Sequence, residues 1–200
     1  MVSDAPFADA PSDAGAASDA VVACVSCASD ACTNGGCDPA VFVTSKEYTG
    51  KIGNGGVAAA DQECAALAAA AGVPGTFQAW LSGAGALPPA TRFANKSSRP
   101  YRMLDGRPVA AHFEALTIDL EHSISVTEKR ADIGFSFVWT ATNKYGTEAV
   151  GGGDCAGWTS DDPTAKGWAG ESDDFNYEWT AFGDIACSKL ARLYCFEQRP

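Results

Sequence analysis

Residues 57–82 read VAAADQECAALAAAAGVPGTFQAWLS, and they contain the strongest secondary-structure signals of the chain. Its alanine-rich first part, residues 57–71, predicts a helix, because alanine is the best helix former and the following Gly-Val-Pro ends the helix. Cys64 falls on one stripe of this helix, so we expect the cysteine to face the core. The other members of the stripe are Ala60, Leu67, Ala68 and Ala71. Residues 77–82, FQAWLS, predict a strand directly after the helix.

Shorter segments surround this helix and strand. Strands are predicted at 41–45 (VFVTS), 101–104 (YRML), 135–140 (FSFVWT), 155–159 (CAGWT) and 192–197 (RLYCFE). A helical turn is expected over 112–116, and long loops are expected over 151–153 and 161–179. One main helix, few short strands, long loops and two long-range cysteine pairs predict a small α+β domain.

The charge balance excludes several classes of partner. The 200 residues carry 14 Lys+Arg against 25 Asp+Glu, a formal net charge of −11, and from Asp38 onward 20 acids still face 14 bases. Such a chain repels the phosphates of nucleic acids and of anionic membrane surfaces. Sulfated sugars meet the same repulsion unless the basic residues cluster on one face. We therefore expect no nucleic-acid partner, and no apolar run approaches the roughly 18–20 residues of a transmembrane segment.

The chain divides into three regions. Residues 1–23 contain mainly Ala, Ser, Asp and Pro, with four acids and no bases. This composition predicts a disordered tether, because it buries too little surface to offset its ordering entropy. Residues 24–40 are expected to form a small cysteine-rich knot, and residues 41–200 the globular domain. No export signal is visible, so we expect an exported protein whose signal segment has been removed.

The cysteines indicate an oxidising compartment, because eight of them in one chain are typical of a disulfide framework. Four lie within fourteen residues, at Cys24, Cys27, Cys32 and Cys37. Two local disulfides are the preferred interpretation of this group. A four-thiolate zinc site is the alternative, although such sites usually show two well-separated cysteine pairs.

Motifs for nucleotide binding and catalysis are weak. Residues 53–58, GNGGVA, fit the pattern G-x-G-x-x-G/A, but TSKEYTGKI separates them from the preceding strand and no acid follows at about twenty residues. We interpret them as a turn. His112 and His122 have no nucleophile motif beside them, and His112, next to Phe113, is expected to be packed rather than catalytic. We therefore expect a protein that is not an enzyme.

Acidic and aromatic residues gather in the last third of the sequence. The acids are Asp154, Asp161, Asp162, Glu171, Asp173, Asp174, Glu178 and Asp184. A solvated acidic rim is the preferred interpretation, and a calcium site formed by two converging loops is the alternative. Trp80, Trp139 and Trp158 are expected in the core. Trp168 and Trp179 lie in the acidic stretch, where an indole can contact a sugar or a protein, with burial as the alternative.

Four blocks of sequence resemble endostatin, the C-terminal domain of certain basement-membrane collagens, and they occur in the order of that family. They are AADQECAALAAAAGVPGTFQAWLS (59–82), YRMLDGRPVAAHFEAL (101–116), VWTATNKYGT followed by CAGWTS (138–147 and 155–160), and CSKLARLYCFEQ (187–198). The same blocks, with an opening FVTS strand, characterise a bacterial family of exported proteins of unknown function. The resemblance covers about residues 41–198. It implies a C-type lectin-like fold with nested disulfides Cys64–Cys195 and Cys155–Cys187.

Departures from the family limit what the resemblance implies about ligands. Endostatin holds zinc with N-terminal histidines, whereas this chain has no histidine before His112. Endostatin binds heparin through an arginine-rich face, which has no counterpart in this acidic domain. Sugar-binding lectins hold calcium with a Trp-Asn-Asp motif, and this chain has Phe182-Gly183-Asp184 at that place. Asp184 is therefore expected to be a loop or turn residue.

These observations together predict a non-catalytic extracellular binding module. We expect a secreted protein or outer-surface lipoprotein, tethered to a bacterial cell, that recognises a protein or glycan through loops between residues 151 and 184. The candidate ligand contacts are Trp168, Trp179, Asp173 and Asp174. The alternative is a calcium-assisted carbohydrate-binding lectin with Asp184 and Asp154 as calcium ligands, and no other cofactor is expected.

Overall fold

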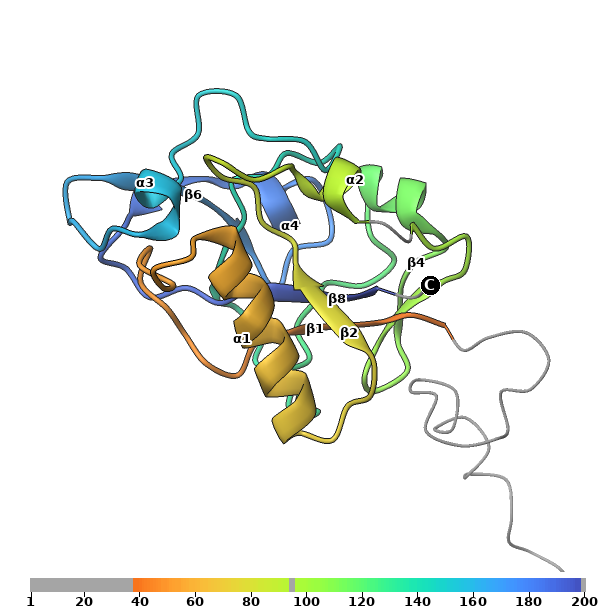
Figure 1. Ribbon diagram of the computed structural model, residues 1–200. Coiled ribbons are helices and arrows are strands. Elements are labelled where there is room, and N and C mark those ends of the chain that lie inside the picture. The colour runs from red at the N-terminus through yellow and green to blue at the C-terminus, as the bar shows by residue number, and fades with distance from the viewer. Residues whose placement is uncertain (1–37, 94–95, 199–200) are drawn as a thin grey trace, which may run out of the picture.

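The computed structural model describes residues 38–93 and 96–198 (Figure 1). The predicted tether and the predicted knot with Cys24, Cys27, Cys32 and Cys37 lie outside these residues. Residues 38–40, which were assigned to the knot, lead directly into the first strand, because that strand begins at Ala40.

The larger sheet has its centre at the first and last strands. The order of its strands is β2, β8, β1, β3, β4. Their bounds are β1 Ala40–Val43, β2 Thr76–Ala79, β3 Tyr101–Met103, β4 Pro108–Ala110 and β8 Tyr194–Gln198. β8 runs antiparallel to both β1 and β2, and Phe42 of β1 lies opposite Cys195 of β8. All four residues of β1 are buried, as expected for a strand paired on both sides.

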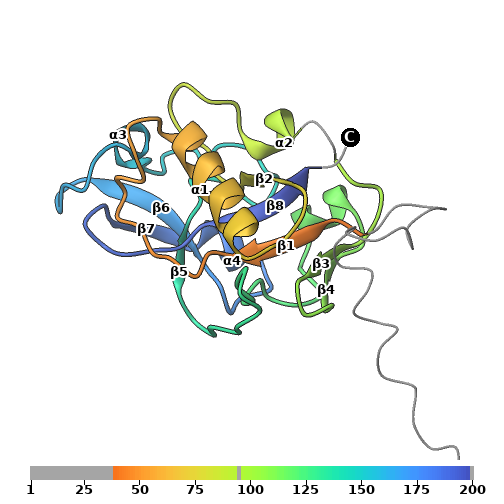
Figure 2. The same ribbon diagram turned by 60° about the horizontal axis from the view of Figure 1, so that its bottom comes forward.

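A smaller antiparallel sheet lies at the opposite end of the molecule from β3 and β4 (Figures 1 and 2). Its strands are β5 (Phe137–Trp139), β6 (Lys166–Glu171) and β7 (Gly183–Ala186), with β6 in the middle. The expected loop over 161–179 was wrong, because β6 lies within it and α4 (Glu178–Ala181) begins near its end. The sequence of β6, KGWAGE, has weak strand propensity, and its pairing on both sides makes it a strand.

Helix α1 (Val57–Ala70) is the predicted main helix, and the Cys64–Cys195 disulfide joins it to β8 with Cα atoms 5.5 Å apart. The buried face of α1 consists of Val57, Ala60, Cys64 and Ala68, so its backbone approaches the sheet closely. Ala71 was wrongly placed on that face: it caps the helix end and is exposed, whereas Leu67 is half-buried.

Three short helical segments complete the secondary structure of the described residues: α2 (Pro89–Arg92), η3 (Phe113–Thr117) and α3 (Cys155–Trp158). η3 confirms the helical turn predicted over 112–116. The strand predicted over 155–159 was wrong, because all four residues of α3 have positive φ angles, which a strand excludes. The second disulfide, Cys155–Cys187, joins α3 to the residue that follows β7, with Cα atoms 5.6 Å apart.

The core is rich in aromatic rings and joins the two sheets. Trp80 is completely buried, with its ring centroid 5.1 Å from that of Trp179 and 5.4 Å from that of Phe196. Its Nε1 donates a hydrogen bond of 2.8 Å to Thr180 Oγ1, which itself donates to the Thr142 carbonyl at 3.0 Å. The prediction of Trp80, Trp139 and Trp158 as core residues is confirmed, since all three are fully buried. Within the described ranges, no helix has the length and apolarity needed to cross a membrane.

Candidate functional site

Trp179, one of the predicted ligand contacts, belongs to the core, and this prediction was wrong. Its side chain is 0% exposed. The reason is that α4 packs against β6, which directs the indole toward Trp80, Tyr194 and Phe196. Trp168 on β6 is half-buried and packs against the core, and a Cβ added at Gly152 would lie 3.0 Å from its ring. Neither indole therefore stands out as an exposed contact.

Asp154 and Asp184, the predicted calcium ligands, hold backbone amides. Asp154 caps α3: Gly157 N–H donates to its Oδ1 at 3.0 Å, and Ala84 N–H donates to its Oδ2 at 2.7 Å. Asp184 was expected in a loop or turn, which was wrong, because it pairs with Trp168 of β6 within strand β7. It accepts a hydrogen bond of 3.2 Å from the Gly153 amide. These contacts give both carboxylates a structural role, and calcium binding by them stays a prediction.

The carboxylates that converge lie at the end of β6 and the start of α4. Glu171, Asp174 and Glu178 each offer one oxygen, and these three oxygens lie within 4.8 Å of one another. Gly170 makes this approach possible, because a Cβ there would lie 2.0 Å from the Trp179 carbonyl oxygen, so only glycine lets α4 pack directly on β6. Asp174 also accepts a 2.8 Å hydrogen bond from the Asn176 amide, which shapes the connecting turn.

These carboxylates repel one another. The pKa of Glu171 is raised above its ordinary value, first by partial burial and then by the negative charges of Asp173, Glu178 and Asp174. The pKa of Tyr177 is raised because its hydroxyl donates a 3.2 Å hydrogen bond to Glu178 and lies in the same negative field. In the described part of the chain, none of the four carboxylates forms an ion pair with Lys, Arg or His.

Three phenyl rings form a continuous surface cluster beside these carboxylates. The Phe135 and Phe137 centroids lie 5.1 Å apart, and those of Phe137 and Phe182 lie 5.6 Å apart. Phe135 is 55% exposed and Phe182 is 44% exposed, whereas Phe137 is half-buried between them. Exposed rings in contact with each other are unusual on a free surface, since each leaves apolar area in water.

The rings and the carboxylates share one face because of the register of the smaller sheet. Phe137 of β5 lies directly opposite Glu171 of β6, and directly opposed residues of an antiparallel pair are side-chain neighbours on the same face. Phe182 is held at β6 by its amide, which donates to the Ala169 carbonyl at 2.9 Å. We call this surface the aromatic–acidic face. Its members are Phe135, Phe137, Glu171, Asp173, Asp174, Glu178 and Phe182.

Two of the seven members of this face were predicted from the sequence as ligand contacts. Asp173 and Asp174 were predicted contact residues, and both lie in it. Phe135 and Phe137 were interpreted only as part of a strand, although their alternation in F-S-F marks one side of that strand. Phe182 was compared only with the calcium motif of lectins.

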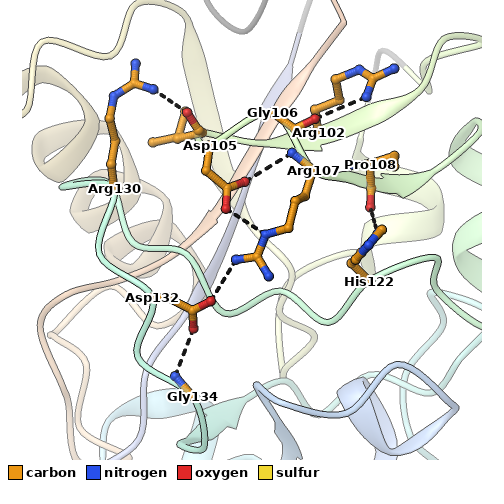
Figure 3. A network of polar contacts seen from close by, with 10 residues as sticks. Arg102, Asp105, Gly106, Arg107, Pro108, His122, Arg130, Asp132 and Gly134 are labelled. Atoms are coloured by element: carbon orange, nitrogen blue, oxygen red, sulfur yellow. Dashed lines mark hydrogen bonds and ion pairs between the residues drawn. The ribbon is translucent and has the colours of Figure 1, made fainter. Parts of the chain in front are cut away.

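Basic residues cluster near the turn between β3 and β4 (Figure 3). Binding of a sulfated sugar would require a cluster of this kind. Arg107 Nε donates to Asp105 at 2.6 Å and its Nη2 donates to Asp132 at 2.7 Å. Arg102 Nε donates to Asp38 at 2.7 Å, while Arg130 donates to the Leu104 carbonyl. Aspartates neutralise Arg102 and Arg107, and Arg107 contacts two of them, so the cluster offers little attraction to an anionic sugar.

The histidines lie at the surface without a nucleophile. His112 was expected to be packed, but it is exposed, and its Nδ1 lies 3.1 Å from Glu114. The extended backbone at this residue directs the ring outward, away from the buried Phe113 beside it. His122 Nδ1 is 2.9 Å from the Pro108 carbonyl oxygen (Figure 3). Neither histidine is paired with a Ser, Thr or Cys side chain in the contacts of the described residues.

No protein-family model matches this chain, and no curated protein matches it either.

Proposed function

We propose that this protein is a non-catalytic extracellular binding module that recognises a protein or glycan partner through the aromatic–acidic face. The observation that carries the proposal is the contiguous cluster of Phe135, Phe137 and Phe182, two of them about half exposed, beside unpaired carboxylates. Aromatic side chains at a protein surface are the residues that most often supply the energy of a binding interface.

We also propose a C-type lectin-like scaffold for this module. Three features support it: the pairing of β1 with β8, the disulfide from the main helix to β8, and the second disulfide nested inside the first. The two nested disulfides are those that the resemblance to endostatin implies. Such a scaffold presents variable loops on a stable core, so the scaffold by itself leaves the ligand open.

The location that fits this function is outside the cell. Two disulfides suit an oxidising environment. We propose a secreted protein or outer-surface lipoprotein, with residues 1–23 as the spacer that separates the module from its anchor.

Calcium-assisted carbohydrate recognition is the second candidate function. The converging carboxylates of Glu171, Asp174 and Glu178 are better candidates for its calcium ligands than Asp154 and Asp184 are. Three carboxylates are few for calcium, which takes six to eight oxygens. Isothermal calorimetry with CaCl₂ distinguishes the candidates. Heat release with a raised melting temperature, both lost in Asp174→Asn, would favour the calcium lectin.

The proposed function is tested by screening the full chain on a neutral glycan array and on a library of random short peptides. The double variant Phe135→Ala/Phe182→Ala removes the exposed rings. Tyr145→Ala/Leu190→Ala removes comparable exposed apolar area elsewhere and is the matched control. We expect to find ligands that bind the wild type and the control variant but do not bind Phe135→Ala/Phe182→Ala. Ligands retained by all three proteins would contradict the proposal.

A further inference from the structure

We infer that the partner of the aromatic–acidic face is a cationic polypeptide segment, rich in Lys or Arg. This inference rests on the proposed function and adds the chemistry of the partner. It is drawn from the charge of the face, from the contact between its rings and its carboxylates, and from the poor fit of other occupants.

The charge of the face is unbalanced. Glu171, Asp173, Asp174 and Glu178 lie close enough for three of them to raise the pKa of the fourth, and no Lys, Arg or His forms an ion pair with them among the described residues. Asp105 and Asp132 near β3 and β4 differ, because both are paired with Arg107. A cation brought to the aromatic–acidic face would relieve the repulsion among its carboxylates.

The rings complete the recognition of Lys or Arg. Phe137 and Glu171 are directly opposed in the sheet, so a charged head group that reaches Glu171 lays its aliphatic stem across a phenyl ring. Long basic side chains bury their methylene stems on apolar surface and keep the head group at a polar site. The face of an aromatic ring also attracts a cation directly. Apolar and anionic surface side by side is thus the complement of a Lys or Arg side chain.

Other occupants fit this surface less well. A neutral glycan would stack on the rings and leave the negative charges of the carboxylates uncompensated, and a sulfated or sialylated glycan would be repelled by them. A second copy of the chain, related by a two-fold axis, would bring two negatively charged copies of the same face together. Calcium would meet three close carboxylates only.

Peptide display tests the inference. A random short-peptide library is selected on the full wild-type chain and counter-selected on Glu171→Gln/Glu178→Gln, which removes two charges and preserves side-chain shape. Asp174 is kept, because it shapes the turn through Asn176. The matched control is Glu148→Gln/Asp161→Asn, which removes two exposed charges elsewhere. An enriched peptide is then titrated against all three proteins at about 0.1 M and about 1 M NaCl, since the screening length falls from roughly 10 Å to roughly 3 Å.

The expected result is enrichment of Lys- and Arg-rich peptides. Their binding weakens by about tenfold or more in Glu171→Gln/Glu178→Gln, is retained in the control variant, and weakens at the higher salt concentration. Equal loss in both double variants would overturn the inference, because net charge and not this face would then bind the peptide. Enrichment of neutral or acidic peptides would also overturn it.

The remaining outcomes separate the inference from the proposed function. Binding of a neutral glycan that depends on Phe135 and Phe182, without peptide enrichment, overturns the cationic partner and keeps the binding face. Sedimentation of the wild type as a dimer that Phe135→Ala/Phe182→Ala dissociates also overturns the cationic partner. Ligands that no face variant affects overturn both.

Discussion

Residues Cys155, Ala156, Gly157 and Trp158 have φ angles of 50°, 56°, 67° and 65° in succession. A left-handed backbone costs roughly 1–2 kcal/mol per residue for residues other than glycine, so such residues occur singly as a rule. The surroundings hold this turn: the disulfide fixes Cys155, Asp154 caps it, and Trp158 Nε1 donates to the Ser82 carbonyl at 2.7 Å.

Ala156 is exposed, so its backbone strain can be tested without disturbing the core. We expect Ala156→Gly to raise the free energy of unfolding by about 0.5–1 kcal/mol, because glycine adopts positive φ without a Cβ penalty. The greater backbone entropy of glycine in the unfolded chain offsets part of this stabilisation. Ala66→Gly, on the exposed side of α1, should lower the free energy of unfolding by about 1 kcal/mol. Chemical denaturation measures both, and destabilisation by Ala156→Gly would show that the turn is not strained.

Glu171 should make stability depend on pH in the direction set by its raised pKa. A carboxyl group whose pKa is higher in the folded than in the unfolded state contributes stability below the unfolded value of about 4.5, and this contribution is lost as the pH rises through the folded pKa. Glu171→Gln should therefore raise the melting temperature more at pH 7 than at pH 4.

Asp162 supplies a control of opposite sign, since hydrogen bonds from Thr164 lower its pKa. Its contribution is present above the unfolded value of about 3.8 and is lost as the pH falls through the folded pKa. Asp162→Asn should lower the melting temperature at pH 7 and have less effect at low pH. If either Glu171→Gln or Asp162→Asn changed the melting temperature by the same amount at every pH, the pKa shift assigned to that residue would be wrong.

Among the elements, the contact of α4 with β6 brings the members of the aromatic–acidic face together. Gly170→Ala would place a methyl group 2.0 Å from the Trp179 carbonyl oxygen, so one of the two elements must move. We expect a loss of about 2–3 kcal/mol of stability, as for overpacked cores. Because the movement separates Glu178 from Glu171, the pKa of Glu171 should also shift toward its ordinary value, which a titration followed by NMR measures.

Gly55→Ala is the control for this substitution. A Cβ at Gly55 would lie 3.4 Å from the backbone nitrogen of Ala59, so the change introduces an ordinary contact. Its effect on stability should be well below that of Gly170→Ala. A Gly170→Ala protein with unchanged stability and unchanged Glu171 titration would contradict the close packing of α4 on β6.

At the scale of the whole molecule, two disulfides close loops of different length. Cys64 and Cys195 are 131 residues apart, and Cys155 and Cys187 are 32 apart. In the chain-entropy model their removal costs about 5 and about 4 kcal/mol respectively. We expect Cys64→Ala/Cys195→Ala to lower the free energy of unfolding more than Cys155→Ala/Cys187→Ala does. The reverse order in chemical denaturation would show that strain near α3 outweighs loop length.

The disulfide variants should also differ in their effect on function. Cys155–Cys187 fixes α3 against the end of β7, next to the smaller sheet that presents the aromatic–acidic face. Loss of this disulfide should weaken binding of a selected peptide, while the larger sheet stays folded by circular dichroism.

Local pattern in the sequence determined the α+β class, the main helix, the buried tryptophans Trp80, Trp139 and Trp158, and the last strand. These features depend on composition and periodicity over a few neighbouring residues, which the sequence displays directly. The pairings of Cys64 with Cys195 and of Cys155 with Cys187 came from the resemblance to endostatin, because counting cysteines leaves their connectivity open.

The exposure of the aromatic side chains near the aromatic–acidic face depends on tertiary packing. Trp179 and Phe182 lie three residues apart around the α4 segment, yet the first is 0% and the second 44% exposed, and only the packing of α4 on β6 distinguishes them. Strand register likewise placed Phe137 opposite Glu171 across 34 residues of sequence. Exposure and long-range register arise when separate elements pack together, so no local pattern contains them.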